Sequence, residues 1–236
     1  MATNGKHDTY TNAVEVYEGG KYTVPGLENF KPEDLGRPPK LQLIQSQSEI
    51  EGVDVNPASG NVGKFYHGLT SAIKARLNVM VLKITKSQIY YSTKEPFDRK
   101  NPPECRSADG VAPDADYMGV FATECAKCPN FRNFRVDPTT GKQLAPTCTS
   151  QINFLMADTE EDDAPAIATL QGASAEAAQF IGQKITFFGF KRSFLLSSVF
   201  ETKNSNSYFK WKAELGPKLT PEEEHRYAMM SLQFAG

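Results

Sequence analysis

Alternating apolar and polar residues predict β-strands in several parts of the chain. The strongest pattern covers residues 77–91, where Leu77, Val79 and Val81 begin a run rich in β-branched and aromatic side chains. A run of this length predicts one long bent strand, or two strands joined by a bulge. Shorter runs predict strands at 41–45, 151–156, 184–190, 194–202 and 208–214. The sequence NSNS separates the last two, which therefore predict a β-hairpin.

Capping residues predict two helices. Ser174 precedes strong helix formers, and we expect Gly182 to end this helix. The sequence TPEE at 220–223 has the pattern of a capping box with proline at the first helical position, so it predicts a C-terminal helix that ends near Leu232. The acidic run at 158–163 is expected to be a loop.

This order of elements predicts a mainly β fold, namely an OB-like, partly open barrel with a long insertion and a C-terminal helix. We divide the chain into a weakly structured lead-in at 1–38, the OB-like domain at 39–218 with the insertion at about 96–149, and the helix at 219–236. A β-sandwich is the alternative, because periodicity does not separate the two architectures.

All four cysteines lie in the insertion. Cys105, Cys125, Cys128 and Cys148 have the spacing C-x19-C-x2-C-x19-C, in a region where apolar periodicity fades. A long segment without regular pattern needs another constraint to keep a shape inside a compact domain. Four thiolates around a CxxC knuckle are the ligand set of a tetrahedral structural zinc site, so we expect Zn²⁺ to be bound here.

Other roles for the cysteines are two disulfides, a redox-active CxxC and four buried thiols. The first residues lack the apolar run of a signal peptide, and the reducing compartment that we therefore expect disfavours disulfides. The knuckle also lacks the βαβ context of a redox motif. Four thiolates leave no position for a catalytic water, and His67 is an outside candidate to replace one ligand.

The net charge of −2 conceals two basic blocks. Residues 62–143 carry 13 basic and 8 acidic side chains, and residues 183–218 carry 7 and 2. Clustered positive charge suits a phosphate backbone, although a solvated surface of mixed charge is the more common explanation.

Aromatic and basic residues are interleaved in three short runs: FRNFR at 131–135, FFGFKRSF at 187–194 and YFKWK at 208–212. Rings that stack on bases and cations that follow the backbone are typical of single-stranded nucleic-acid surfaces. Many of these rings are expected to belong to the core, as strand alternation places Phe209 and Trp211 on one face. The candidate contacts to nucleic acid are Tyr90, Tyr91, Arg132, Arg135, Lys191, Arg192, Lys210 and Lys212.

Signatures of catalysis and of membrane insertion are missing from the sequence. There is no GxxxxGK[ST], GxSxG or HExxH motif, so we expect no enzymatic activity. No stretch of about 18 apolar residues predicts a membrane span, and we expect a soluble, cytoplasmic protein without a membrane partner.

Several short motifs resemble a family. PKLQLIQ at 39–45, PPECRSADG at 102–110, ECAKCP at 124–129 and Cys148 are similar to a group of bacteriophage proteins with a four-cysteine insertion. At fold level, a zinc-bearing insertion in an OB-like barrel also resembles the single-stranded DNA-binding proteins of phage replication systems. The resemblance implies a host cytoplasmic location and replication or recombination proteins as partners.

These observations favour a single-stranded DNA-binding protein of phage-type replication or recombination, with zinc organising the insertion. The alternative is a zinc-stabilised protein-interaction module that binds host transcription or defence machinery. A metal-dependent nuclease is a third hypothesis, and it requires a second metal with oxygen ligands.

Overall fold

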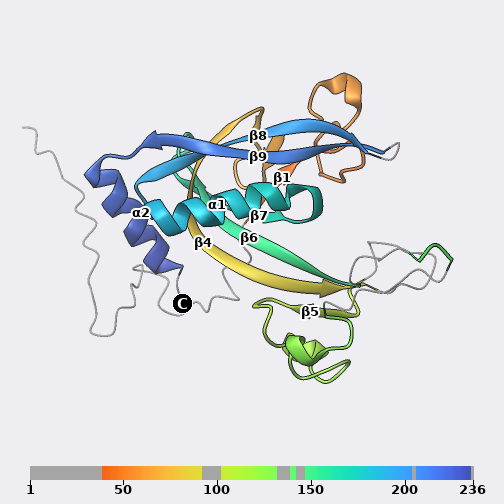
Figure 1. Ribbon diagram of the computed structural model, residues 1–236. Helices are drawn as coiled ribbons and strands as arrows, with labels where there is room; N and C mark the ends of the chain where they lie inside the picture. The colour runs from red at the N-terminus through yellow and green to blue at the C-terminus, as the bar shows by residue number, and fades with distance from the viewer. Residues whose placement is uncertain (1–38, 92–101, 132–138, 142–146, 204–205, 235–236) are drawn as a thin grey trace, which may run out of the picture.

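The computed structural model describes residues 39–91, 102–131, 139–141, 147–203 and 206–234. These residues form a nine-stranded sheet that curls into an open half-barrel, with two α-helices against it (Figure 1). The strands are β1 (Lys40–Leu43), β2 (Phe65–His67), β3 (Ile73–Lys74), β4 (Leu77–Tyr90), β5 (Cys105–Ser107), β6 (Cys148–Asp158), β7 (Ala164–Leu170), β8 (Arg192–Lys203) and β9 (Asn206–Lys218). The helices are α1 (Ala175–Phe188) and α2 (Pro221–Gln233).

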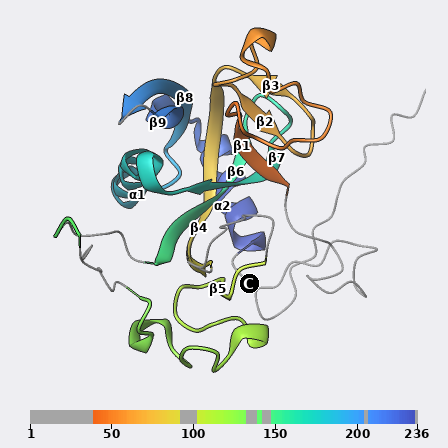
Figure 2. The ribbon, with the colours of Figure 1, turned by 90° about the vertical axis from the view of Figure 1, so that its right-hand side faces the viewer.

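The sheet has the order β3-β2-β1-β7-β6-β4-β8-β9, and β5 pairs with β4 outside this path. Strands β4, β6 and β7 pair in sequence, and β8 returns after α1 to lie beside β4. A fourth strand that returns beside the first is a Greek-key arrangement. The turned view in Figure 2 shows the curl, with β8 and β9 on one side and β1 to β3 on the other.

Strand β4 is the predicted long bent strand. It pairs with β8 only at its beginning, from Leu77 to Val79, and with β6 from Val79 to its end. The register between β4 and β6 shifts between Val81 and Lys83, as in a β-bulge. Because a bulge bends its strand, β4 joins the two halves of the curled sheet and then carries the chain out to the insertion.

The predicted hairpin of β8 and β9 is confirmed, and its outer part is docked on the loop that follows β1. The side-chain amide of Gln45 donates to the carbonyl of Phe209 at 2.8 Å and accepts the Phe209 N–H at 2.9 Å, as a neighbouring strand would. Gly63, with a φ of +85°, lies so close to Phe209 that an added Cβ would be 2.5 Å from the ring. A side chain at this position would therefore push the hairpin away.

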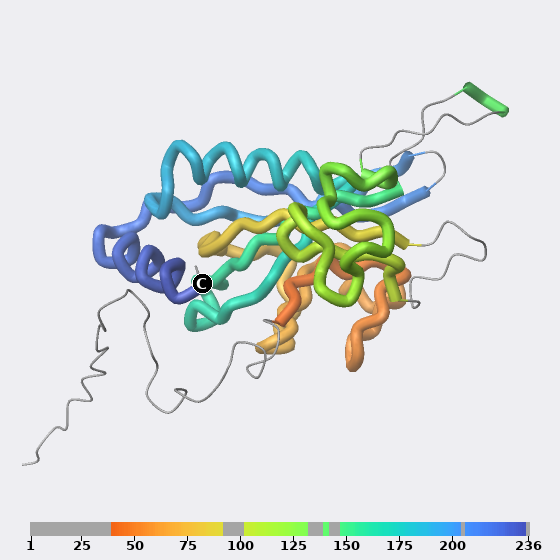
Figure 3. The backbone as a smooth tube through the Cα atoms, turned by 90° about the horizontal axis from the view of Figure 1, so that it is seen from below, coloured from red at the N-terminus to blue at the C-terminus, as the bar shows by residue number. Residues whose placement is uncertain are grey.

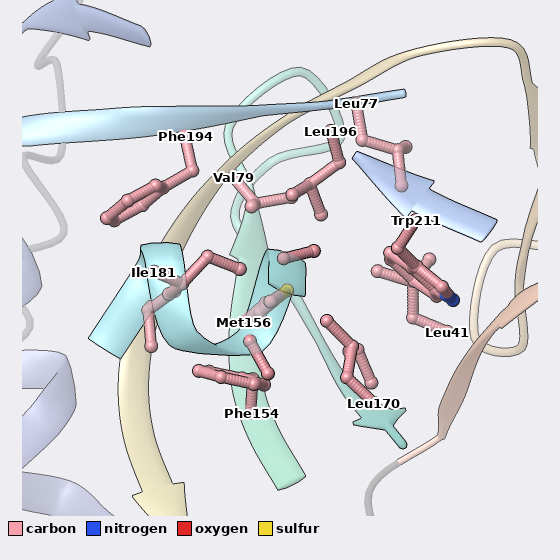
Figure 4. Close-up of a cluster of buried hydrophobic side chains, with 14 of the residues drawn as sticks. Leu41, Leu77, Val79, Phe154, Met156, Leu170, Ile181, Phe194, Leu196 and Trp211 are labelled. Carbon is pink, nitrogen blue, oxygen red and sulfur yellow. The ribbon is translucent and has the colours of Figure 1, made fainter. Parts of the chain in front are cut away.

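The main core fills the concave side of the sheet (Figure 4). Phe154 and Met156 of β6 meet Phe194 and Leu196 of β8, and Trp211 of β9 packs against Phe65 with ring centroids 4.7 Å apart. Helix α1 covers this core with Ala177, Ala178 and Ile181.

The prediction of a strand at 184–190 was wrong, and so was the helix end at Gly182. Helix α1 continues to Phe188, and Gly189, with a φ of +55°, is its C-cap. Ile185 lies four residues after Ile181 and packs against the same core. Burial of this helical stripe outweighs the cost of about 1 kcal/mol for a glycine within the helix and the β propensity of its last turn.

Strand β7 was missed by the sequence analysis. Its residues Ala166, Ala168 and Leu170 face the core, but alanine and Pro165 are weak strand signals. The acidic run at 158–163 was predicted as a loop; residues 159–163 form the turn between β6 and β7, and Asp158 ends β6. Lys74 contacts Asp158 at 3.1 Å and Glu161 at 2.9 Å.

Helix α2 follows the predicted capping box. Thr220 accepts the Glu223 N–H at 3.3 Å, and Glu223 accepts the Thr220 N–H at 2.8 Å. The helix packs Tyr227 on the other side of the sheet, where a second core contains Met80, Leu82, Leu155, Ala157 and Leu219. We call this side the outer face.

Candidate nucleic-acid face and cysteine cavity

A groove of about 270 Å³ lies on the outer face of β4, β6 and β7, next to the end of α2. We call it the outer groove, and it is lined by Lys83, Thr85, Asn153, Leu155, Ile167 and Phe234. Figure 3 looks toward this side of the molecule and shows α2 at one end of these strands and the insertion at the other. Of these two segments, α2 contributes its C-cap residue Phe234 to the lining of the outer groove.

Polar side chains continue from the outer groove across three strands. Asn153 donates to Ser87 and accepts from Thr169, each at 2.8 Å. Gln151 donates to Gln171 at 2.9 Å. Amide and hydroxyl groups of this kind both donate and accept, so this surface can exchange its internal hydrogen bonds for bonds to a polar ligand.

Two lysines border the apolar part of the outer groove. The ammonium group of Lys83 donates to the carbonyl of Phe234 at 2.6 Å. Lys40 is exposed and pairs in register with Ile167, so it lies on the same face as that groove residue. The groove thus combines an aliphatic floor, the ring of Phe234, hydrogen-bonding groups and positive charge. The sequence analysis missed this combination, because it depends on the pairing of strands that are distant in sequence.

The lysines predicted on β9 are ion-paired within the protein. Lys210 lies 2.8 Å from Glu201 and 3.8 Å from Glu176, and Lys212 lies 2.8 Å from Glu214. The hydrogen bond from Lys210 holds the pKa of the half-buried Glu201 carboxyl below its usual value. Two of the seven basic side chains of this block are therefore paired with carboxylates, which lie on β8, on β9 itself and on α1.

The other predicted contacts are spread over the molecule. Arg192 donates through Nε and Nη2 to the carbonyl of Gly216, at 3.1 and 2.9 Å, and Lys191 is exposed between α1 and β8. Tyr90, at the end of β4, makes an edge contact with Phe121, and Tyr91 follows it directly. The predicted contacts Arg132 and Arg135 lie outside the described residues.

The first part of the insertion is shaped by two aspartates. Asp109 accepts the backbone N–H groups of Val111 and Ala112 at 2.7 and 3.1 Å, and these bonds lower the pKa of its carboxyl. Asp114 accepts from the Arg106 guanidinium at 2.6 Å and from the Ala108 N–H at 2.8 Å. The CRSADG sequence is thus a hydrogen-bonded turn that leads out of β5.

All four cysteines line one cavity of about 20 Å³. Cys105 and Cys148 both pair with Tyr90, from opposite sides of β4, while Cys125 begins the 3₁₀ turn Cys125–Lys127 that Cys128 ends. Burial, and then the nearby Cys128 and Cys125, raise the pKa of Cys148 to about 11 and also raise that of Cys105. The four thiols are free, so the structure shows no disulfide among them.

The sulfurs are gathered but not yet in a coordination geometry. Across the described ranges, no group of three or more His, Cys, Asp or Glu side chains is arranged to hold a metal ion. His67 is not part of the cavity. It is buried at the end of β2, where Nε2 lies 3.3 Å from the Ala164 carbonyl and Nδ1 accepts the N–H groups of Leu69 and Thr70.

The exposed surface of residues 102–131, within the insertion, is acidic and apolar. Residues 102–131 contain five acidic and two basic side chains, and both cations are paired, Arg106 with Asp114 and Lys127 with Glu124. The side chains of Val111, Met118 and Val120 are 66%, 51% and 55% exposed. This part of the insertion does not share the positive charge of the block in which it lies.

Comparisons of the chain with protein-family models, curated proteins and solved structures gave no match. In the part of the chain that the structure covers, helices with the length and apolar character of a membrane span are absent.

Proposed function

We propose that this protein binds single-stranded DNA across the outer groove, and that its five main strands are an OB-type barrel. The connectivity β4-β6-β7-α1-β8-β9 carries this proposal. The first strand pairs with the second and the fourth, and the fourth pairs with the fifth, as in the Greek key of an OB fold. OB folds bind oligonucleotides on the face of their second and third strands, and here those strands are β6 and β7.

The chemistry of the outer groove supports the same ligand. Leu155, Ile167 and the Phe234 ring offer an apolar surface for a base, while Lys40 and Lys83 offer positive charge for the phosphates. Asn153 and Thr85 supply hydrogen-bonding groups beside the apolar floor. The loop between the first and second strands of an OB fold also contacts the ligand, and in this chain that loop is the insertion.

Fluorescence anisotropy with labelled oligo-dT, measured over a range of salt concentrations, tests this proposal. We expect affinity to fall as salt rises, because each phosphate contact releases a counterion. Lys40→Ala should weaken binding and reduce the slope of log K against log salt by about 0.7, the value for one lost contact on a single strand.

Lys218→Ala is the matched control. Lys218 is also an exposed lysine near the end of a strand, but it lies on β9, at the end next to α2. Equal losses of oligo-dT affinity in Lys40→Ala and Lys218→Ala would mean that binding is not localised to the outer groove. No binding of wild-type protein at low salt would overturn the proposal, and tighter binding of oligo-U would assign the face to RNA.

The surface of the insertion favours a second candidate, the protein-interaction module. Its exposed Val111, Met118 and Val120, in a segment with an excess of acidic side chains, suit a protein partner with a basic and apolar surface, and they disfavour phosphate. A host transcription or defence complex should then be retained by the wild-type protein and lost with Met118→Ser and Val120→Ser. Identification by mass spectrometry, with oligo-dT affinity measured on the same variants, distinguishes the two functions.

A further inference from the structure

The cysteines of the insertion are not used by the proposed DNA-binding face, and their arrangement needs its own explanation. They come from three separate places: β5, the start of β6 and the 3₁₀ turn between them. All four nevertheless line the same cavity. Four thiols without a common ligand would have no reason to converge on one point.

The size and lining of the cavity favour a single ion. A volume of about 20 Å³ is close to the space that one water-sized particle occupies. A cluster of several iron and sulfide atoms needs more room. The rest of the lining is mixed. It includes the rings of Tyr90, Phe121 and Phe131 and the polar side chain of Gln88, whose Oε1 accepts from the Cys148 thiol at 3.6 Å.

We propose that Cys105, Cys125, Cys128 and Cys148 bind one zinc ion in a closed, structural site. Four thiolates are the preferred ligand set for such a site, and sulfur excludes hard cations such as Mg²⁺ and Ca²⁺. With Zn–S bonds of about 2.3 Å, the sulfurs of a tetrahedral site lie about 3.8 Å apart. In the described residues no three of these thiols have that arrangement, so metal binding requires them to move into it.

The metal would hold the insertion to the barrel. Cys105 and Cys148 flank Tyr90 on β4, so the ion joins the ends of three adjacent strands to the knuckle. The described insertion residues have little apolar core of their own, apart from contacts such as that between Tyr90 and Phe121. Removing the ion should therefore release the insertion and leave the barrel folded.

Metal analysis of the purified chain, prepared without chelators, is the first test. We expect one zinc per chain and four thiols that become reactive only as the zinc is released by a mercurial reagent. Less than about half an equivalent of zinc, in protein that takes up none when zinc is supplied under reducing conditions, overturns the proposal. Iron with acid-labile sulfide would also overturn it. Substitution with Co²⁺ should give the visible absorption of tetrahedral thiolate coordination.

Cys128→Ser should lower zinc affinity by at least tenfold, whereas Ala126→Ser, an exposed position in the same turn, should leave it unchanged. Equal zinc affinity in the two variants would contradict the site. If Cys128→Ser does not fold, titration of wild-type protein with a chelator gives the same information by limited proteolysis. Cleavage should then appear within 92–147 while the barrel persists. Because oligo-dT binding is a separate measurement, loss of zinc and loss of DNA affinity are distinguishable.

Discussion

The two ends of the outer face of β4 and β6 are closed in different ways. At one end, α2 buries Tyr227 against Met80, Leu82 and Leu155, and the Ser231 hydroxyl donates to the Leu82 carbonyl at 2.6 Å. At the other end, the insertion contributes turns held by Asp109 and Asp114 and four thiols around a small cavity. Apolar burial joins the first end to the fold, whereas the second end depends on local hydrogen bonds and, in our proposal, on zinc.

This difference shows that the residues that stabilise the sheet need not be those that hold the insertion in place. Burial of α2 residues is coupled to the barrel core through β4, so a change there is felt by the whole domain. The described part of the insertion pairs with the sheet at the end of β4, and we expect it to open as a separate unit. The outer groove lies between these two ends and takes Phe234 from the stable one.

The largest effect should come from Tyr227→Ala, which breaks the stable end. Tyr227 is 1% exposed, and its hydroxyl donates to Asp163 at 2.5 Å. Loss of a buried aromatic side chain should lower the free energy of unfolding by about 3–5 kcal/mol, measured by urea denaturation. Met118→Ala, on the surface of the insertion, should change it by less than about 0.5 kcal/mol. Similar losses from both variants would show that the two ends are equally coupled to the core.

High pH should weaken the same end by a smaller amount. Burial, and then the hydrogen bond to Asp163, raise the pKa of Tyr227 to about 12 from an unfolded value of 10. The unfolded chain therefore loses this proton first, and the stabilisation is complete below pH 10 and lost as pH rises through 12. Two pKa units correspond to about 2–3 kcal/mol.

Tyr227→Phe separates the effect of Tyr227 on the pH dependence of stability from the effect of the lysines, which titrate in the same pH range. The variant should be less stable than wild type near neutral pH, because Asp163 loses its hydroxyl partner, and its stability should fall less steeply between pH 10 and 12. Denaturation curves at several pH values provide the comparison. An identical fall in both proteins would exclude Tyr227 as the titrating group.

The stable end was also the more predictable one. The TPEE sequence predicts α2, since its capping box uses only residues within one turn. The alternation that begins at Leu77 likewise predicts β4. By contrast, the second half of α1 depends on contact of Ile181 and Ile185 with the sheet, and β7 depends on its place between β1 and β6. Neither contact is visible in a short window of sequence.

The candidate sites also differ in how far the sequence predicts them. Spacing alone predicts that the four cysteines come together, and the structure places all four around one cavity. The charge pattern predicts a basic face on β9, but it does not show that Lys210 and Lys212 are paired with Glu201 and Glu214. The outer groove could not be predicted, because Lys40, Lys83 and Phe234 meet only through strand register and the packing of α2.

The smallest of these effects tests the start of α2. Thr220→Ala removes the side-chain cap from the Glu223 N–H and should cost about 1 kcal/mol of global stability. Glu222→Ala is the control, because this exposed residue shares the first turn and its favourable interaction with the helix dipole is worth only a few tenths of a kcal/mol. Proteolysis of the insertion should be unchanged in both variants. If Thr220→Ala accelerated cleavage within 92–147, the two ends of the outer face would be coupled and the proposed separation between them would be wrong.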